Sequence, residues 1–174
     1  IDVSYQGISD LTGIEAFSSL TDLDCSGNSI ASLNLSGNTS LSWLQCIANN
    51  MTSINVTNCP NLSFFNCGNN LITTIDVSNN PLIQQLWAFG NQLTNLDLSN
   101  NNNILSLELN DNQLTNIDVS NLLNLNDFRC ANNNITTLDL SNNTLLSTIV
   151  VFNNSALTSL NLKNIDEALK LFHT

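Results

Sequence analysis

The sequence is poor in charged residues, and poorer still in basic ones. Lysine and arginine number 3 against 14 aspartates and glutamates in 174 residues, which gives a formal net charge of −11. Nucleic acids are recognised through a basic footprint, and anionic membranes attract clustered lysine and arginine. We therefore expect neither nucleic acid nor a membrane surface among the partners of this chain.

A long apolar stretch is also absent. No run of eighteen apolar residues occurs, so the sequence predicts no helix inserted in a membrane. The chain begins at Ile1 without a basic region followed by an apolar one, so it shows no signal peptide. A start at isoleucine rather than methionine suggests a segment excised or processed from a longer protein.

Side chains that perform acid–base or metal chemistry are scarce as well. His173 is the single histidine, and the 5 cysteines are an odd number that suits no disulfide framework. Asp22 and Asp24 are close in sequence, but nothing marks them as a catalytic carboxylate pair. The sequence therefore predicts no catalytic residue, no metal site and no cofactor.

Asparagine, in contrast, is abundant and regularly spaced. It recurs every twenty-one residues, at Asn28, Asn49, Asn70, Asn91, Asn112, Asn133 and Asn154. Self-similarity at a fixed period indicates a solenoid of stacked units. An asparagine side chain offers an acceptor oxygen and two donor hydrogens, so we expect this column to bond backbone groups of its own coil and of the next. The column is a structural ladder, and we expect no ligand on it.

Apolar residues share the period of the asparagines. In the first half of each unit they alternate with other residues, as in 23–25 and 65–67, and the second half repeats the alternation, as in 33–35. A period of two is typical of short strands with one buried face. We predict strands on two sides of each coil, with four cysteines buried as inert thiols in one inward column.

The whole pattern, L-x-x-L-x-(L/C)-x-x-N-x-(I/L)-x-x-L-x-L-x-x-N, resembles the leucine-rich repeat, in the nested 21-residue form of a bacterial subclass. Residues 10–17 resemble the first unit of bacterial internalins. The resemblance implies a right-handed, curved solenoid that is mainly β, with a parallel sheet on its concave side. It also implies a binding role for the exposed positions of that sheet, and a secreted or cell-surface protein.

We divide the chain into three parts: an incomplete N-terminal repeat or cap (1–19), seven leucine-rich repeats (20–164) and a C-terminal cap (165–174). Leu157 and Leu160 come one residue late, which predicts a bulge near 154–157. In the C-terminal cap the acids come first and Lys170 comes late, which suits the dipole of a helix.

The exposed positions of the second-half strands are uniform. They include a column of aspartates, each followed two residues later by a serine: Asp76, Asp97, Asp118 and Asp139. We favour carboxylates that accept hydrogen bonds from serine and threonine of neighbouring turns. A row of calcium-like cation sites is the alternative, since hard cations bind carboxylate oxygens.

The exposed positions of the first-half strands differ from unit to unit. Trp43 and Phe64 are neighbours on adjacent strands, and Trp87 is one diagonal step from Phe64. Glu108 and Arg129 share one column and could pair. The candidate ligand-binding residues are Trp43, Phe64, Trp87, Phe89, Ile47, Glu108 and Arg129. The alternatives are an aromatic ladder that only stabilises the sheet, and a surface covered by a flanking domain.

These patterns predict a non-catalytic binding module that recognises a protein partner through the concave sheet, because tryptophan and arginine dominate interface hot spots. A polysaccharide ligand comes second, since flat aromatic rings beside amides suit sugars. A structural spacer within a larger secreted protein is a third possibility. The sequence leaves the oligomeric state open.

Overall fold

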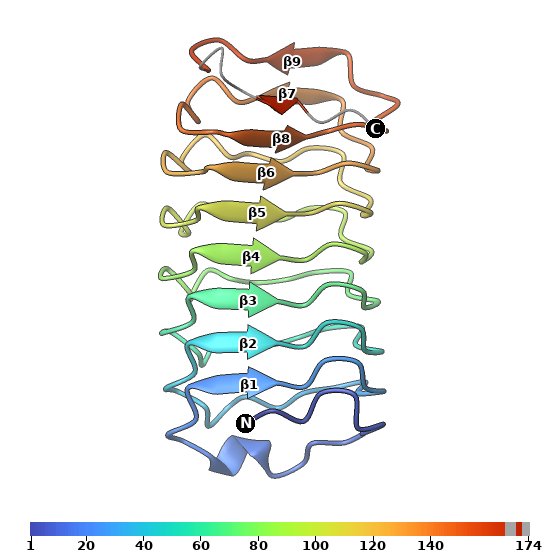
Figure 1. Cartoon of the computed structure of the whole chain (residues 1–174), viewed down its shortest axis with the longest axis vertical. Helices are drawn as coiled ribbons and strands as arrows, with labels where there is room; N and C mark the ends of the chain where they lie inside the picture. The colour runs from blue at the N-terminus through green and yellow to red at the C-terminus, as the bar shows by residue number, and fades with distance from the viewer. Residues whose placement is uncertain (166–169, 172–174) are drawn as a thin grey trace.

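Each repeat contributes one short strand to a parallel sheet that runs the length of the stack (Figure 1). In this computed structural model the described residues are 1–165 and 170–171. The eight strands of the sheet follow one another in this order: β1 (Asp22–Asp24), β2 (Trp43–Gln45), β3 (Phe64–Asn66), β4 (Gln85–Trp87), β5 (Ser106–Glu108), β6 (Asp127–Arg129), β8 (Thr148–Val150) and β10 (Lys170–Leu171). The described part contains little helix, a 3-10 turn η1 (Ile14–Ala16).

The register of this sheet follows from the period of the sequence. Residues one repeat apart are direct partners, so that Leu23 pairs with Leu44 and Leu44 pairs with Phe65. In the seven three-residue strands of this sheet the middle residue is fully buried, while its two neighbours point outward. The predicted solenoid with buried apolar columns is therefore confirmed, and its core lies directly behind the sheet.

The asparagine ladder is confirmed at the carboxyl end of the strands. Asn91 is typical: its amide nitrogen donates to the carbonyl oxygens of Cys67, Ala88 and Phe89, and its oxygen accepts from the backbone nitrogen of Ile72 at 3.0 Å. The same pattern recurs at every ladder position from Asn49 to Asn154. Because the ladder joins each coil to the one before it, one buried side chain satisfies four backbone groups.

The second half of the coil differs from the prediction in most units. Strands were expected on this side throughout, but a parallel pair forms only once within the described residues, between β7 (Thr137–Asp139) and β9 (Ser159–Asn161). Elsewhere grooves lie between the second halves of consecutive coils, for instance between 94–99 and 115–121. Consecutive coils are joined at the start of this side, here called the outer side, as by the bond from Leu71 N–H to Met51 O, but grooves separate them further along.

A second asparagine ladder supports this outer side. Asn101 donates to the carbonyl oxygens of Val77 and Asn80, and its own oxygen is buried without a hydrogen-bond partner. Asn38, Asn80 and Asn143 share this arrangement. Each residue of the second ladder therefore makes half as many bonds as one of the first.

Both ends of the stack continue the backbone pairing. The backbone nitrogens of Val3 and Tyr5 donate to Asp24 and Ser26, so the first residues lie against β1. The extra residue of the last repeat is absorbed in a turn in which Leu157 N–H donates to Asn154 O, and this agrees with the expected irregularity. The helix expected in 165–174 falls largely outside the described residues; Lys170–Leu171 form a strand there rather than helix.

The cysteines are buried free thiols, as predicted from their inward column. Burial raises the pKa of the Cys67 and Cys130 thiols to about 12. A thiol must lose its proton to act as a nucleophile, so these groups stay inert at neutral pH. No helix within residues 1–165 is long and apolar enough to cross a bilayer.

Candidate binding face

The outward side of the sheet, here called the sheet face, carries the residues that vary between repeats. In every three-residue strand the first and third side chains point away from the core, because successive residues of a strand face opposite sides. Residues two positions after the strand extend the same face. Parallel pairing then stacks these positions into columns, which brings residues far apart in sequence into contact.

Three aromatic side chains form a continuous row on this face. Trp43 and Phe64 are register partners whose rings stack with centroids 5.0 Å apart and planes 10° apart. Phe64 meets Trp87 edge to face, with centroids 5.1 Å apart and planes at 77°. The Trp87 indole nitrogen donates to the Ser106 hydroxyl at 3.1 Å, which fixes the ring. We call Trp43, Phe64 and Trp87 the aromatic row.

The aromatic row is half-buried rather than fully exposed. Aromatic pairs in stacked or edge-to-face geometry gain about 0.5–1.5 kcal/mol beyond the area that they bury. Part of the role of these rings is thus to stabilise the sheet. The remaining exposed part of the three adjacent rings is apolar, and contacts between the rings hold it in place, which suits an anchoring site for a ligand.

Phe89 and Ile47 lie in the neighbouring column, at the end of the sheet face nearer the asparagine ladder. The Phe89 ring lies over Gly68, since a Cβ atom on Gly68 would come within 2.7 Å of that ring. Ile47 is the residue on the other side of Gly68 in the same column, and both Phe89 and Ile47 are half-buried. The structure thus places these two candidates beside the aromatic row but outside its ring-to-ring contacts.

Glu108 and Arg129 are register partners on β5 and β6, but they do not form the expected ion pair. The Arg129 side chain binds Asp127, two residues away on its own strand, with Nε 2.9 Å from Oδ1. Strand partners two apart lie on the same side of the sheet, so this closer carboxylate takes the guanidinium. The Arg129 side chain stays 40% exposed, and such pairs contribute little stability.

Glu108 is therefore left with a weak contact, an Asn110 amide at 3.3 Å. Desolvation raises the pKa of the Glu108 carboxyl above its ordinary value, and the nearby positive charge of Arg129 only partly offsets this. Glu108 is the register partner of Trp87 on the adjacent strand. A half-buried carboxylate thus directly adjoins the aromatic row.

The aspartate column of the second half bonds within its own turn, not to neighbouring turns as expected. Asp97 Oδ1 accepts from the backbone nitrogen of Ser99 at 2.9 Å, and the other aspartates of the column do the same. These bonds with Ser99 lower the pKa of Asp97. In other coils Asn34 and Asn55 accept the same bond. The turn therefore needs a side-chain oxygen here, and a negative charge is not required.

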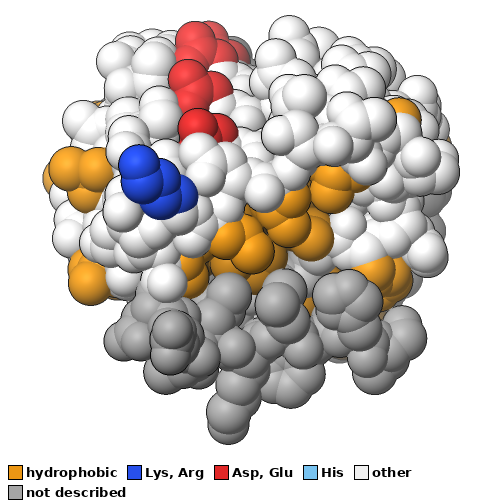
Figure 2. Space-filling model, turned by 90° about the horizontal axis from the view of Figure 1, so that it is seen from above, with side chains coloured by type: hydrophobic (Ala, Val, Ile, Leu, Met, Phe, Trp, Pro, Cys, Tyr) orange, Lys and Arg blue, Asp and Glu red, His pale blue; other side chains and the backbone are white. Residues whose placement is uncertain are grey.

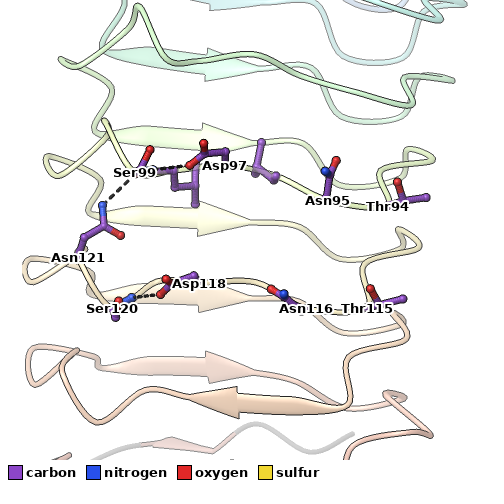
Figure 3. A pocket seen from close by; sticks show the side chains of 11 residues that line it. Thr94, Asn95, Asp97, Ser99, Thr115, Asn116, Asp118, Ser120 and Asn121 are labelled. Atoms are coloured by element: carbon purple, nitrogen blue, oxygen red, sulfur yellow. Dashed lines mark hydrogen bonds between the residues drawn. The ribbon is translucent and has the colours of Figure 1, made fainter.

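One groove of about 410 Å³ lies along this outer side, between two consecutive coils (Figure 3). Threonine, asparagine, aspartate and serine line it together with Leu96 and Leu98, and Asp97 and Asp118 face it from different coils (Figure 3). Seen from the C-terminal end, acidic side chains follow one another along one side of the stack (Figure 2). Among the described residues no group of three or more histidine, cysteine, aspartate or glutamate side chains converges as a metal site would require.

Sequence reasoning missed three residues that shape the sheet face. Gly68 leaves the space that the Phe89 ring fills, Ser106 holds the Trp87 indole, and Asn66 is 4% exposed beside Trp87. Gly68 could have been found, because it stands without a side chain in a column next to a phenylalanine. The bond to Ser106 depends on the rotamer of Trp87, and the sequence gives no sign of it.

Comparison with solved structures identifies the fold. No protein-family model and no curated protein matches the chain. An internalin, InlF, from Listeria monocytogenes is 23% identical with a TM-score of 0.79, over 88% of this chain and 51% of that one. A leucine-rich-repeat protein of Leptospira interrogans, LIC12759, is 20% identical with a TM-score of 0.64, over 92% of this chain and 50% of that one.

A plant peptide hormone receptor, RGFR1, solved in complex with RGF2, is 22% identical with a TM-score of 0.69, over 91% of this chain and 34% of that one. The chain thus has a leucine-rich-repeat fold, and it spans about half the length or less of these three structures. At these identities the likeness concerns the fold alone.

Proposed function

We propose that this chain is a non-catalytic binding module that recognises a protein partner through its sheet face. The observation that carries the proposal is the aromatic row, in which three large rings from three different repeats meet on one side of the sheet. The rest of the repeat is uniform, so the scaffold itself has no need of aromatic residues at these positions. Interfaces concentrate their binding energy in such rigid aromatic anchors.

The other features of the chain agree with a binding role. Its thiols are buried and the aspartates of the second-half column are engaged in turns, so neither group supplies an activated nucleophile beside a base among the described residues. A plant peptide hormone receptor of the same fold was solved in complex with RGF2, and a peptide or protein ligand suits this chain as well. With a net charge of −11, a nucleic acid is disfavoured as the ligand.

A polysaccharide is the second candidate, because the Trp43 and Phe64 rings stack nearly parallel and side-chain amides adjoin them. The Gln45 amide, for example, is on the same strand as Trp43 and donates to Asp24 at 3.0 Å. A sugar ring could lie on the aromatic surface while its hydroxyls meet these groups. A spacer without any ligand is the third, and it would bury the row against a flanking domain.

We further propose a secreted or cell-surface location, which rests on the resemblance of the repeat to those of bacterial surface proteins. The division into an N-terminal cap (1–19), seven repeats (20–164) and a C-terminal cap (165–174) is also a proposal. Backbone bonds from Val3 and Tyr5 to the first complete repeat support it at one end.

A parallel screen tests the function. The chain is presented to a displayed library of random peptides and to a glycan array, and every selected ligand is measured again on variants. The double variant Trp43→Leu/Trp87→Leu keeps apolar volume and removes the flat rings, so it should stay folded. We expect peptide ligands whose affinity falls at least about tenfold on this variant, about 1.4 kcal/mol.

The matched control is Asp97→Asn/Asp118→Asn on the opposite side of the coil, which should leave affinity unchanged. Ligands confined to the glycan array would replace the protein-binding proposal by the polysaccharide one. Selected peptides that bind the tryptophan variant as well as the unaltered chain would remove the sheet face from the account altogether.

A further inference from the structure

Carboxylates stand at both ends of the aromatic row. Asp22 on β1 is the register partner of Trp43, and Glu108 on β5 is the register partner of Trp87. With Phe64 in the middle, five adjacent strands each contribute one side chain, in the order acid, aromatic, aromatic, aromatic, acid. The acids therefore mark the two ends of a single line across the sheet.

Neither terminal carboxylate forms an ion pair within the described residues. Asp22 accepts a hydrogen bond from the neighbouring Thr21 hydroxyl, and Glu108 accepts one from the Asn110 amide; both donors are neutral. Arg129, the register neighbour of Glu108, is held by Asp127, and the α-ammonium of Ile1 donates to the backbone oxygen of Asp22 at 2.7 Å, not to its carboxylate. Asp24 adds a further carboxylate on β1, bonded to the Gln45 amide. The line thus presents negative potential at each end and an apolar surface between.

Glu108 in particular would gain from a cationic neighbour. It is half-buried against the sheet, and desolvation disfavours its ionised form. A positive group placed over it would offset that cost. The same group could lie against the Trp87 ring, since cations are attracted to indole faces within about 6 Å.

We propose that the partner lays an extended segment along this line, with a basic residue at each end of a short apolar stretch. The inference rests on the proposed function and names the chemistry of the ligand for the same face. Basic ends meet Asp22 and Glu108, and apolar side chains between them lie on Trp43, Phe64 and Trp87. The partner crosses the strands instead of running along them, because the five residues lie on five strands.

The spacing of the basic residues follows from the geometry of the sheet. Four strand intervals of about 4.8 Å, combined with an offset of two residues (about 6.6 Å) along the strands, give roughly 20 Å between the two acids. An extended chain rises about 3.3 Å per residue, so about six residues span that distance. Side chains an even number apart face the same side, so both basic residues and two apolar residues between them can face the sheet.

The test uses three capped synthetic heptapeptides with a fluorescent label, measured by anisotropy on the complete chain. The first, Arg-Thr-Leu-Thr-Leu-Thr-Arg, has the inferred spacing. The second replaces both arginines by glutamate, and the third, Thr-Leu-Arg-Thr-Arg-Leu-Thr, has the same composition with the arginines close together. We expect the first to bind at least about tenfold more tightly than the second, and several-fold more tightly than the third.

Two charge variants separate local recognition from attraction to an acidic protein. Asp22→Asn/Glu108→Gln and Asp97→Asn/Asp118→Asn each remove two negative charges, the first pair on the line and the second on the outer side. The line variant should lose about tenfold in affinity for the first peptide, and the outer variant should lose none. Equal losses in both, or equal affinities for the arginine and glutamate peptides, would overturn the inference.

The proposed function is tested separately by the peptide library. If the library yields ligands without paired basic residues that still depend on Trp43 and Trp87, the sheet face binds a protein partner and only the basic spacing is wrong. If library ligands ignore the tryptophans, the proposed function itself fails.

Discussion

The two halves of each coil use the same alternating pattern for different purposes. On the first half, backbones pair into a continuous sheet and the outward residues change from repeat to repeat. On the second half, the coils stand apart, and the outward residues are nearly constant because each must cap a local turn. Positions that keep nearly the same residue in every repeat are therefore explained by the hydrogen bonds they make to the nearby backbone. Positions that change between repeats share no such role in the scaffold, and a ligand would account for them.

The two asparagine ladders show the same division in the core. From Asn49 onward a residue of the first ladder makes four bonds, and asparagine is kept at all seven positions from Asn28 to Asn154. The second ladder makes two bonds and is replaced by Cys59 and Leu122. Where Leu122 stands, the Asn121 amide donates to Leu98 O instead. The weaker ladder can therefore lose a member, while the stronger cannot.

The largest expected effect is the loss of unfolding free energy when a residue of the first ladder, rather than of the second, is replaced. Asn91→Ala leaves the buried N–H of Ile72 without a partner and removes one of the two amide donors to the Cys67 carbonyl, the other being Asn70. We expect it to lower the free energy of unfolding by roughly 3 kcal/mol. Asn101→Ala should cost only about 1 kcal/mol, since it also removes an unsatisfied buried oxygen. Urea denaturation of both variants measures the difference. Equal costs would show that the two ladders are equivalent.

The next effect concerns acid. Hydrogen bonds from serine lower the pKa of the four column aspartates in the folded chain. Their stabilising contribution is therefore complete above about pH 3.9 and is lost as the pH falls through the lowered folded pKa. Replacing all four by asparagine should reduce the loss of Tm between about pH 5 and pH 2. A variant that melts in acid like the unaltered chain would exclude these carboxylates as the cause.

Two variants at Asp97 show separately what the turn's hydrogen bond and the negative charge contribute to stability. Asp97→Ala removes the acceptor for the Ser99 N–H and should lower Tm by a few degrees at neutral pH. Asp97→Asn keeps the acceptor, as Asn34 and Asn55 do in other coils, and should leave Tm unchanged. Calorimetry of the pair gives the answer, and a fall for both would mean that the charge matters.

A smaller, opposite effect is expected at the turn after β2. Ala48 has φ 56°, in the left-handed region that glycine and asparagine tolerate best, and Gly27, Asn69 and Gly90 occupy the equivalent position in neighbouring coils. Ala48→Gly relieves this strain and should raise the free energy of unfolding by about 0.5–1 kcal/mol. Thermal melts would reveal it; a lower Tm would show that the Ala48 side chain contributes packing that outweighs the strain.

The smallest effect is an expected absence of change. Because the aspartate column is explained by its turns, calcium at millimolar concentration should not shift Tm. A bound cation would stabilise the folded chain in proportion to the logarithm of its concentration. A rising Tm on titration with calcium would therefore restore the cation row as a property of the outer side.

The sheet register and the aromatic row could be predicted from the sequence, because a fixed period determines which residues become neighbours. The contact of Trp43 with Phe64 and the edge contact of Phe64 with Trp87 both follow from counting twenty-one residues and an alternating strand. The missing strands of the outer side could not be foreseen in this way. Whether backbones pair depends on how far apart the coils stand there, and the alternation of side chains is the same in either case.

The partner of Arg129 was also beyond the sequence. Register alone makes Glu108 and Asp127 equally plausible ion-pair partners of Arg129. The choice depends on the rotamer of Arg129, which brings its Nε within 2.9 Å of Asp127 Oδ1. This choice of partner alters the electrostatics of the sheet face, since it leaves Glu108 without an ion pair. The inference of a basic partner depends on that detail.

The central claim is that the sheet face binds a protein partner, while the outer side of the coils serves only to stabilise the fold. The chain has 2 tryptophans, Trp43 and Trp87, and both belong to the aromatic row, so intrinsic fluorescence reports on this surface without a label. On titration with a library-selected peptide, we predict a saturable change in tryptophan emission and protection from acrylamide quenching, with the same Kd as calorimetry. Calorimetric binding that leaves the emission and the quenching unchanged would contradict the account.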